Sequence, residues 1–128
     1  MLLVGVREKN GWLMSRWQLT YGAGWEHICN AVYTAYDYFV NTEILVNDEL
    51  ETLVEKDEIF DLIEAGKMTL RGQSVMINVP MMITFYNQTN IVDVNVPCDQ
   101  DEFQKPDYRS FNKSLCQFMD SLELAMYI

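Results

Sequence analysis

The sequence predicts an α+β fold, in which an antiparallel sheet of about five or six strands carries helices packed on one face. The strands would form an N-terminal hairpin and a C-terminal meander. Apolar residues alternate near the start and after the middle of the chain, and they recur at steps of three and four in other segments. The two kinds of segment are largely separated along the chain, as is typical of this class. A chain of 128 residues is expected to form a single domain over residues 1–128.

The N-terminal part is predicted to contain a hairpin followed by a helix. Residues 2–7 and 12–20 have the composition and partial alternation of strands, and Asn10-Gly11 between them is typical of a tight hairpin turn. Apolar residues at helical spacing then predict a helix over residues 25–40, after a glycine-rich break.

The middle of the chain is predicted to form two short helices over residues 48–65. Its apolar residues fall into two patches, and the acidic pair Asp57-Glu58 between them suits a helix N-terminus. Gly66 is well placed to end the second helix, because glycine tolerates the left-handed conformation that often follows a last turn.

The C-terminal half is predicted to form a meander and a final helix. Residues 67–96 alternate with a period of two and divide into four short strands, with a turn at Gly72-Gln73 and one strand over residues 75–79. From Tyr108, apolar residues at steps of three and four predict a helix of about 18 residues.

The composition excludes some classes of partner. Lys and Arg number 9 against 19 Asp and Glu, which gives a net charge of −10. Phosphate recognition needs a cationic surface, so direct binding of nucleic acid is not expected. The apolar run at residues 2–6 is too short for a signal peptide, no stretch approaches the ~18 apolar residues of a membrane span, and the cysteines are odd in number. We therefore expect a cytoplasmic protein with reduced thiols and no membrane partner.

No catalytic or metal-binding pattern stands out in the sequence. The single histidine, His27, is two residues from Cys29, and such neighbours on a helix point to different sides. The spacings typical of zinc and calcium sites are missing, and Gly22 and Gly24 lack the rest of a phosphate-binding loop. We expect no enzyme activity, no catalytic residue, no metal and no cofactor.

The acidic residues are concentrated in one part of the chain. Residues 37–64 contain ten acids and a single base, Lys56. Acids at positions 48, 51, 55 and 58 follow steps of 3, 4 and 3, so a helix would place them on one face, where like charges repel each other. Such a face suits a basic protein partner, and the alternative is a solvated surface that aids solubility. The expected partner-binding residues are Asp48, Glu51, Glu55, Glu58 and Asp61, with Tyr33 and Tyr38 as aromatic anchors.

The acidic stretch of residues 48–64 and the exposed tyrosines expected before it resemble, in composition, the immunity proteins of bacterial contact-dependent growth-inhibition and polymorphic toxin systems. The resemblance implies a protein that binds a cognate basic toxin domain, often a nuclease, and blocks it. It carries over no functional residue, because these proteins share no single motif across their folds. Two alternatives compete with it: a phage-type nucleic-acid mimic that inhibits a DNA-binding enzyme, and a small enzyme or ligand-binding domain with His27 or a carboxylate in a deep pocket.

Overall fold

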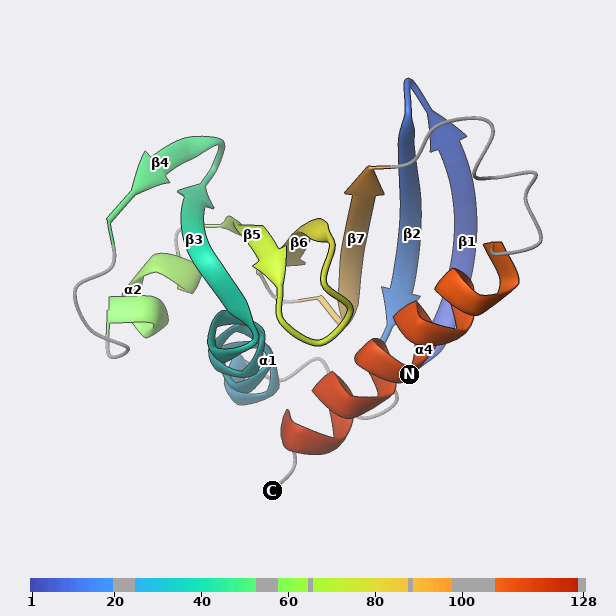
Figure 1. Ribbon diagram of the computed structural model, residues 1–128. Coiled ribbons are helices and arrows are strands. Elements are labelled where there is room, and N and C mark those ends of the chain that lie inside the picture. Colours follow the sequence, from blue (N-terminus) through green and yellow to red (C-terminus); the bar gives the residue numbers. More distant parts are fainter. Residues whose placement is uncertain (20–24, 53–57, 65, 88, 98–107, 127–128) are drawn as a thin grey trace.

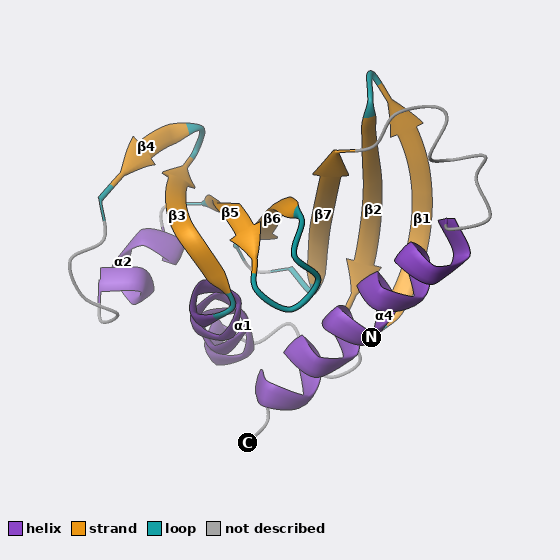
Figure 2. Ribbon diagram, in the orientation of Figure 1, coloured by secondary structure: helices purple, strands orange, loops and turns teal. Residues whose placement is uncertain are grey.

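The computed structural model (Figure 1) describes residues 1–19, 25–52, 58–64, 66–87, 89–97 and 108–126. The α+β class is confirmed, and the antiparallel sheet has seven strands, more than predicted, in the order β1-β2-β7-β6-β5-β3-β4 (Figure 2). The elements in chain order are β1 (Leu2–Lys9), β2 (Trp12–Gln18), α1 (Trp25–Asp37), β3 (Phe39–Val46), β4 (Glu49–Glu51), α2 (Glu58–Glu64), β5 (Lys67–Ser74), β6 (Pro80–Tyr86), β7 (Ile91–Pro97) and α4 (Tyr108–Met126).

Two tight turns form the hairpins at the two edges of the sheet. Asn10 and Gly11 join β1 to β2 with φ angles of 53° and 81°, which confirms the predicted N-terminal hairpin. Asn47 and Asp48 join β3 to β4 with φ angles of 51° and 68°. Positive φ at both central residues is the geometry whose twist matches that of the flanking strands.

The first helix is shorter than predicted because a strand follows it directly. The sequence predicts a helix over residues 25–40, but α1 ends at Asp37. After one turn residue, Tyr38, the chain enters β3, in which Phe39 pairs with Ser74 of β5. Pairing with a strand that lies far along the chain therefore outweighs the helical spacing of these apolar residues.

The segment predicted as two helices contains a strand and one helix. The prediction covered residues 48–65, whereas Glu49–Glu51 pair with β3 and only Glu58–Glu64 are helical among the described residues. The Asn47-Asp48 turn explains the difference, because it reverses the chain and returns it along the edge of the sheet. The second predicted helix is present as α2, and Gly66 follows it with a φ of 138°.

The turn between β5 and β6 lies later than predicted. The sequence predicts a turn at Gly72-Gln73 and a strand over residues 75–79, but β5 continues to Ser74 and the turn follows it. The hydroxyl of Ser74 accepts a hydrogen bond from the backbone N–H of Met76 at 3.2 Å. Asn78 then adopts a φ of 53°, so the turn is built by polar residues that sit among apolar ones.

The remaining C-terminal elements agree with the prediction. β6 and β7 coincide with predicted strands, and β5, β6 and β7 are antiparallel neighbours in chain order. The final helix, α4, begins at Tyr108 and has 19 residues. Across the part of the chain that the structure describes, every helix is too short or too polar to cross a membrane.

One face of the sheet shares its core with the helices. Along β2 and β7, buried residues alternate with exposed or half-buried ones, and β6 follows the same pattern except at Thr84, which is also buried. The buried residues of α1, α2 and α4 belong to the same core cluster as those of the strands, in agreement with the arrangement in Figure 1. The opposite face of the sheet, called the outer face below, carries Met14, Arg16, Arg71, Met82, Asp93 and Asn95 among its residues.

Gly72 is predicted to tolerate no side chain, in contrast to Gly5. A Cβ at Gly72 would lie 2.8 Å from the carbonyl oxygen of Val40, where β3 bulges against β5, whereas a Cβ at Gly5 would meet nothing within 4 Å. Gly72→Ala should therefore lower the free energy of unfolding by roughly 1–3 kcal/mol, and Gly5→Ala should change it by less than about 0.5 kcal/mol. Urea unfolding of the two variants measures the difference. Equal losses would contradict this explanation of the bulge.

Candidate binding surfaces

The acids predicted to share one helix face lie on three different elements. Asp48 lies in the turn between β3 and β4, Glu51 ends β4, and Glu58 and Asp61 lie on α2. Glu55 lies outside the described residues. The predicted arrangement on a single helix face is therefore wrong, because β4 occupies part of the segment.

Asp48 is neutralised within the protein. Its two carboxylate oxygens lie 2.9 and 3.1 Å from the ammonium nitrogen of Lys67. The preceding turn residue, Asn47, accepts a hydrogen bond from the backbone N–H of Lys67 at 3.1 Å. The turn is thus held against the start of β5 by a contact that sequence spacing could not reveal, because its partners are far apart in the chain.

The other acids of this segment gather at one end of the molecule. β4 is the last strand of the sheet, and α2 lies at the same end (Figure 1). Glu49 and Glu51 of β4 pair with buried residues of β3. Their side chains therefore lie on the face of the sheet that carries the helices. The acidic end consists of Glu49, Glu51, Glu58, Asp61 and Glu64, all of them exposed.

The two tyrosines predicted as exposed anchors are packed against the core instead. Tyr33 on α1 and Tyr38 just after it are half-buried. The ring of Tyr38 meets that of Phe118 on α4 edge-on, with the ring centroids 5.8 Å apart. The expectation of exposed rings is therefore wrong, because both rings are half-buried. The Tyr38–Phe118 contact joins the residue after α1 to α4.

The surroundings of His27, Cys29 and Cys116 provide no support for a reactive site, and Cys98 lies outside the described residues. His27 is half-buried on α1 and lines neither of the two cavities described below. Among the described residues, no group of three or more His, Cys, Asp or Glu side chains could hold a metal ion. Cys29 is buried, and burial together with the charge of Asp120 raises the pKa of the Cys116 thiol, which makes it less reactive at neutral pH.

Cations of the strands gather on the outer face, which sequence reasoning did not single out. The strand register assigns each of these cations to the outer face, because the residues opposite it on the adjacent strands lie on that face. Alternation along a strand could have assigned these positions to one face, but only the strand order brings them together. The cations are Arg7, Lys9, Arg16, Lys67 and Arg71.

Arg16, Asp93 and Tyr86 form a hydrogen-bonded network on this face. Nε and Nη2 of Arg16 donate to the two carboxylate oxygens of Asp93 at 2.8 and 3.0 Å, and the Tyr86 hydroxyl donates to Asp93 at 2.5 Å. Burial works to raise the pKa of Asp93, but the hydrogen bonds from Arg16 and Tyr86 and the charges of Arg16 and Arg7 outweigh it and lower the pKa. Burial and the contact with Asp93 raise the pKa of Tyr86 to about 12. At neutral pH, Asp93 is therefore ionised and Tyr86 is neutral.

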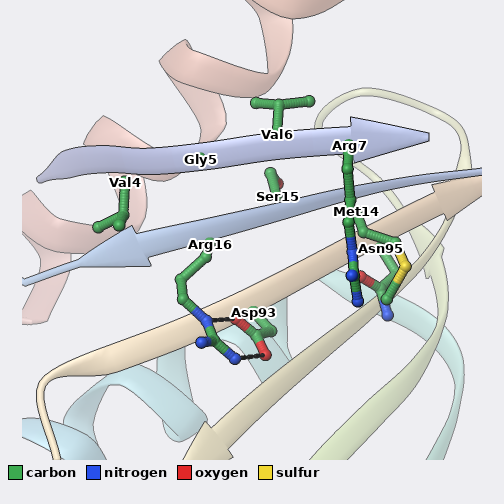
Figure 3. A pocket seen from close by; sticks show the side chains of 9 residues that line it. All are labelled: Val4, Gly5, Val6, Arg7, Met14, Ser15, Arg16, Asp93 and Asn95. Carbon is green, nitrogen blue, oxygen red and sulfur yellow. Dashed lines mark hydrogen bonds and ion pairs between the residues drawn. The ribbon is translucent and has the colours of Figure 1, made fainter. Parts of the chain in front are cut away.

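A shallow cavity of about 360 Å³, called the β1–β2–β7 cavity below, opens beside this network (Figure 3). Figure 3 shows the side chains of Arg7, Met14 and Arg16 pointing to the same side of the strands. Gly5 contributes no side chain, so the cavity is open at its position. Two neighbouring cross-strand rows form the cavity floor, the first made of Arg7, Met14 and Asn95 and the second of Gly5, Arg16 and Asp93.

A second cavity, of about 450 Å³, lies between α4 and the turn after β5. Its lining includes the exposed apolar residues Met76 and Leu124, together with Asp120. Among the described residues, the lining contains no cation, and it adds the polar side chains of Ser114, Gln117 and Ser121 to the apolar ones.

Comparison with known proteins identified no relative: no protein-family model, curated protein or solved structure matches the chain.

Asp93→Asn should lower the free energy of unfolding at pH 7 by about 1–2 kcal/mol, because Arg16 loses its carboxylate and the hydrogen bond from Tyr86 weakens. Since the pKa of Asp93 is lowered in the folded protein, its stabilising contribution is present above the unfolded-state pKa of about 3.9 and is lost as the pH falls through the folded-state value. The difference between the unmodified protein and the variant should therefore shrink below about pH 4 in urea unfolding measured across the pH range.

Glu43→Gln is the matched control for this substitution. It removes the carboxylate of the Arg71–Glu43 pair, in which both side chains are 50% exposed. An exposed pair of this kind contributes little, so the expected loss is at most about 0.5 kcal/mol. If the difference in unfolding free energy between the unmodified protein and Asp93→Asn stayed constant down to pH 2, the ionised carboxylate would not be the source of the stabilisation.

Proposed function

We propose that this chain is an acidic binding protein that neutralises a basic protein through its acidic end, and that the basic protein is a cognate bacterial toxin domain. One observation carries the proposal. Glu49, Glu51, Asp61 and Glu64 are exposed and make no ion pair with another described residue. The chain would thus act as an immunity protein, in keeping with the resemblance in composition.

The distribution of cations supports this reading. Arg16, Lys67 and Arg71 pair with Asp93, Asp48 and Glu43, so these three cations do not neutralise the five acids of the acidic end. Repulsion among exposed carboxylates is screened by salt and costs little stability. A basic partner meeting this end would gain in association rate and in selectivity against acidic proteins.

An exposed apolar residue, Leu50, lies beside the acidic end on the opposite face of the sheet. Its side chain is 66% exposed in the middle of β4 and lies beside Leu45 of β3, on the outer face. Glu49 and Glu51 flank it and point to the other face. A partner that wraps around this edge of the sheet would bury an apolar residue within a charged rim, which is a common composition for protein interfaces.

A nucleic-acid mimic would use the same acids against a DNA-binding enzyme. Duplex DNA presents one phosphate charge per ~1.7 Å of its axis, so a mimic needs a long row of acids. The acidic end is instead a compact group on one short strand and one short helix, which favours a protein that recognises a patch. Competition separates the two functions, because duplex DNA should displace a mimic from its target and should leave an immunity complex intact.

The test of the proposed function combines capture with a growth assay. Tagged protein is used to capture partners from cells of its source, and each captured protein is expressed alone and together with this chain. The proposal expects a basic partner that stops growth when expressed alone and is harmless in the presence of this chain. A full set of captured proteins without toxicity would overturn it.

Charge reversal at the acidic end should weaken the complex more than the same change elsewhere. Glu51→Lys and Asp61→Lys should each lower affinity for the captured toxin domain roughly tenfold, with the largest effect at low salt, because they place a cation opposite the partner's basic residues. Asp120→Lys makes the same change in net charge at an exposed position on α4 and should alter affinity less than about twofold. Calorimetric titration at two salt concentrations measures these effects, and equal losses in all three variants would reject a localised interface.

A further inference from the structure

The β1–β2–β7 cavity presents two polar side chains that the fold itself does not use. Arg7 reaches over Met14 toward Asn95 in the same cross-strand row (Figure 3). Within the described part of the chain, neither the Arg7 guanidinium nor the Asn95 carboxamide makes a hydrogen bond, although the charge of Arg7 acts on Asp93. An exposed cation and an amide donor side by side form a suitable arrangement for a carboxylate.

The positive charge available in the cavity amounts to one unit. The positive charge of Arg16 is neutralised by Asp93, whose carboxylate accepts two hydrogen bonds from the Arg16 guanidinium. Both residues lie in the second row, next to the row that contains Arg7. Among the described residues, Arg7 is the only further cation that lines the cavity. A ligand with a single negative charge would therefore be matched, whereas a second negative charge would face Asp93.

Apart from Ser15, which is buried and hydrogen-bonded to Val94 and Trp17, the rest of the described lining is apolar or empty. Val4 and Met14 provide apolar surface, and Gly5 leaves open space at the end of the second row. Glycine is not needed here for close packing, since a Cβ at this position would meet nothing within 4 Å. A short apolar chain could lie over Gly5 between these side chains.

We propose that the β1–β2–β7 cavity binds a small organic monoanion, whose carboxylate contacts Arg7 and Asn95 and whose apolar chain covers Gly5 beside Val4 and Met14. The cavity of about 360 Å³ is at the small end of the range for ligand sites. The ligand is thus a short-chain carboxylic acid or a compound of similar size. This site is on the outer face near β1 and is independent of the acidic end.

Nuclear magnetic resonance of the ¹⁵N-labelled protein tests the proposal with hexanoate as the probe. The amide signals of Gly5, Arg7 and Asn95 should shift and saturate, with a dissociation constant in the low millimolar range expected for so small a ligand. Hexanamide, which has the same chain without the charge, and acetate, which has the charge without the chain, should each bind at least about tenfold more weakly. Comparable shifts with any two of these probes, or no saturable shift with hexanoate, would overturn the proposal.

Three variants locate the site. Arg7→Gln should weaken hexanoate binding roughly tenfold by removing the cation, and Gly5→Leu should do so by filling the open space. Lys9→Gln removes the same charge from the same strand but outside the cavity lining, and it should change affinity by less than about twofold. If Lys9→Gln weakened binding as much as Arg7→Gln, the probe would be held only by the general charge of the strand, and the proposal would fail. Thermal unfolding of each variant establishes that the fold is retained.

Discussion

A seven-stranded sheet whose five inner strands are buried on one face is the constraint on which the rest of this structure depends. Period-two alternation sends the apolar half of these inner strands into the core that the helices share, whereas the edge strands β1 and β4 contribute no buried residue. The other half must then be compatible with water and with its cross-strand neighbours. Thr69 and Thr84 meet this demand through a hydroxyl–hydroxyl hydrogen bond of 2.9 Å between adjacent strands. Arg16 and Asp93 do the same with opposite charges.

The need for polar residues on the outer face also separates the positive from the negative charges of the protein. The strands place their cations on the outer face, where each acid on a neighbouring strand gains a partner. Few cations are then left for a chain with a net charge of −10, and acids at the β4 edge and on α2 stay exposed. A charged edge strand has a second benefit, because it discourages pairing with the sheets of other molecules. The acidic end is thus compatible with a protective role for β4 as well as with binding.

Local signals were sufficient for some elements and not for others. The Asn10-Gly11 turn, the alternation of β6 and β7, and the helical spacing of α4 are each complete within a short stretch, and each prediction is confirmed. β3 follows α1 after a single residue and contains a bulge, so its apolar residues continue the helical spacing of α1. Its identity depends on pairing with β5, which no local pattern encodes.

The candidate surfaces, like β3, depend on contacts between distant segments that local sequence patterns do not reveal. Exposure of Glu51, Glu58 and Asp61 followed from composition and spacing, but the pairing of Asp48 with Lys67 did not, because the two residues meet only when β3 and β5 are neighbours. The β1–β2–β7 cavity has an origin of the same kind. Arg7 and Asn95 are brought into one row by the register of three strands, two from the start of the chain and one, β7, from far along it. Asn47-Asp48 is a residue pair suited to a tight turn before β4, but the acids that follow it are spaced as on a helix, and the helical spacing led to the wrong prediction.

The positions of the two surfaces make them electrostatically independent. β1 and β4 are the opposite edges of the sheet, and with ~4.8 Å between adjacent strands they are separated by about 30 Å across it. At physiological ionic strength the Debye length is about 8 Å, so a charge changed at one edge is almost fully screened at the other. Any coupling between the acidic end and the β1–β2–β7 cavity would therefore have to pass through a movement of the sheet. The shared core of strands and helices opposes such a movement, since closely packed interiors deform little.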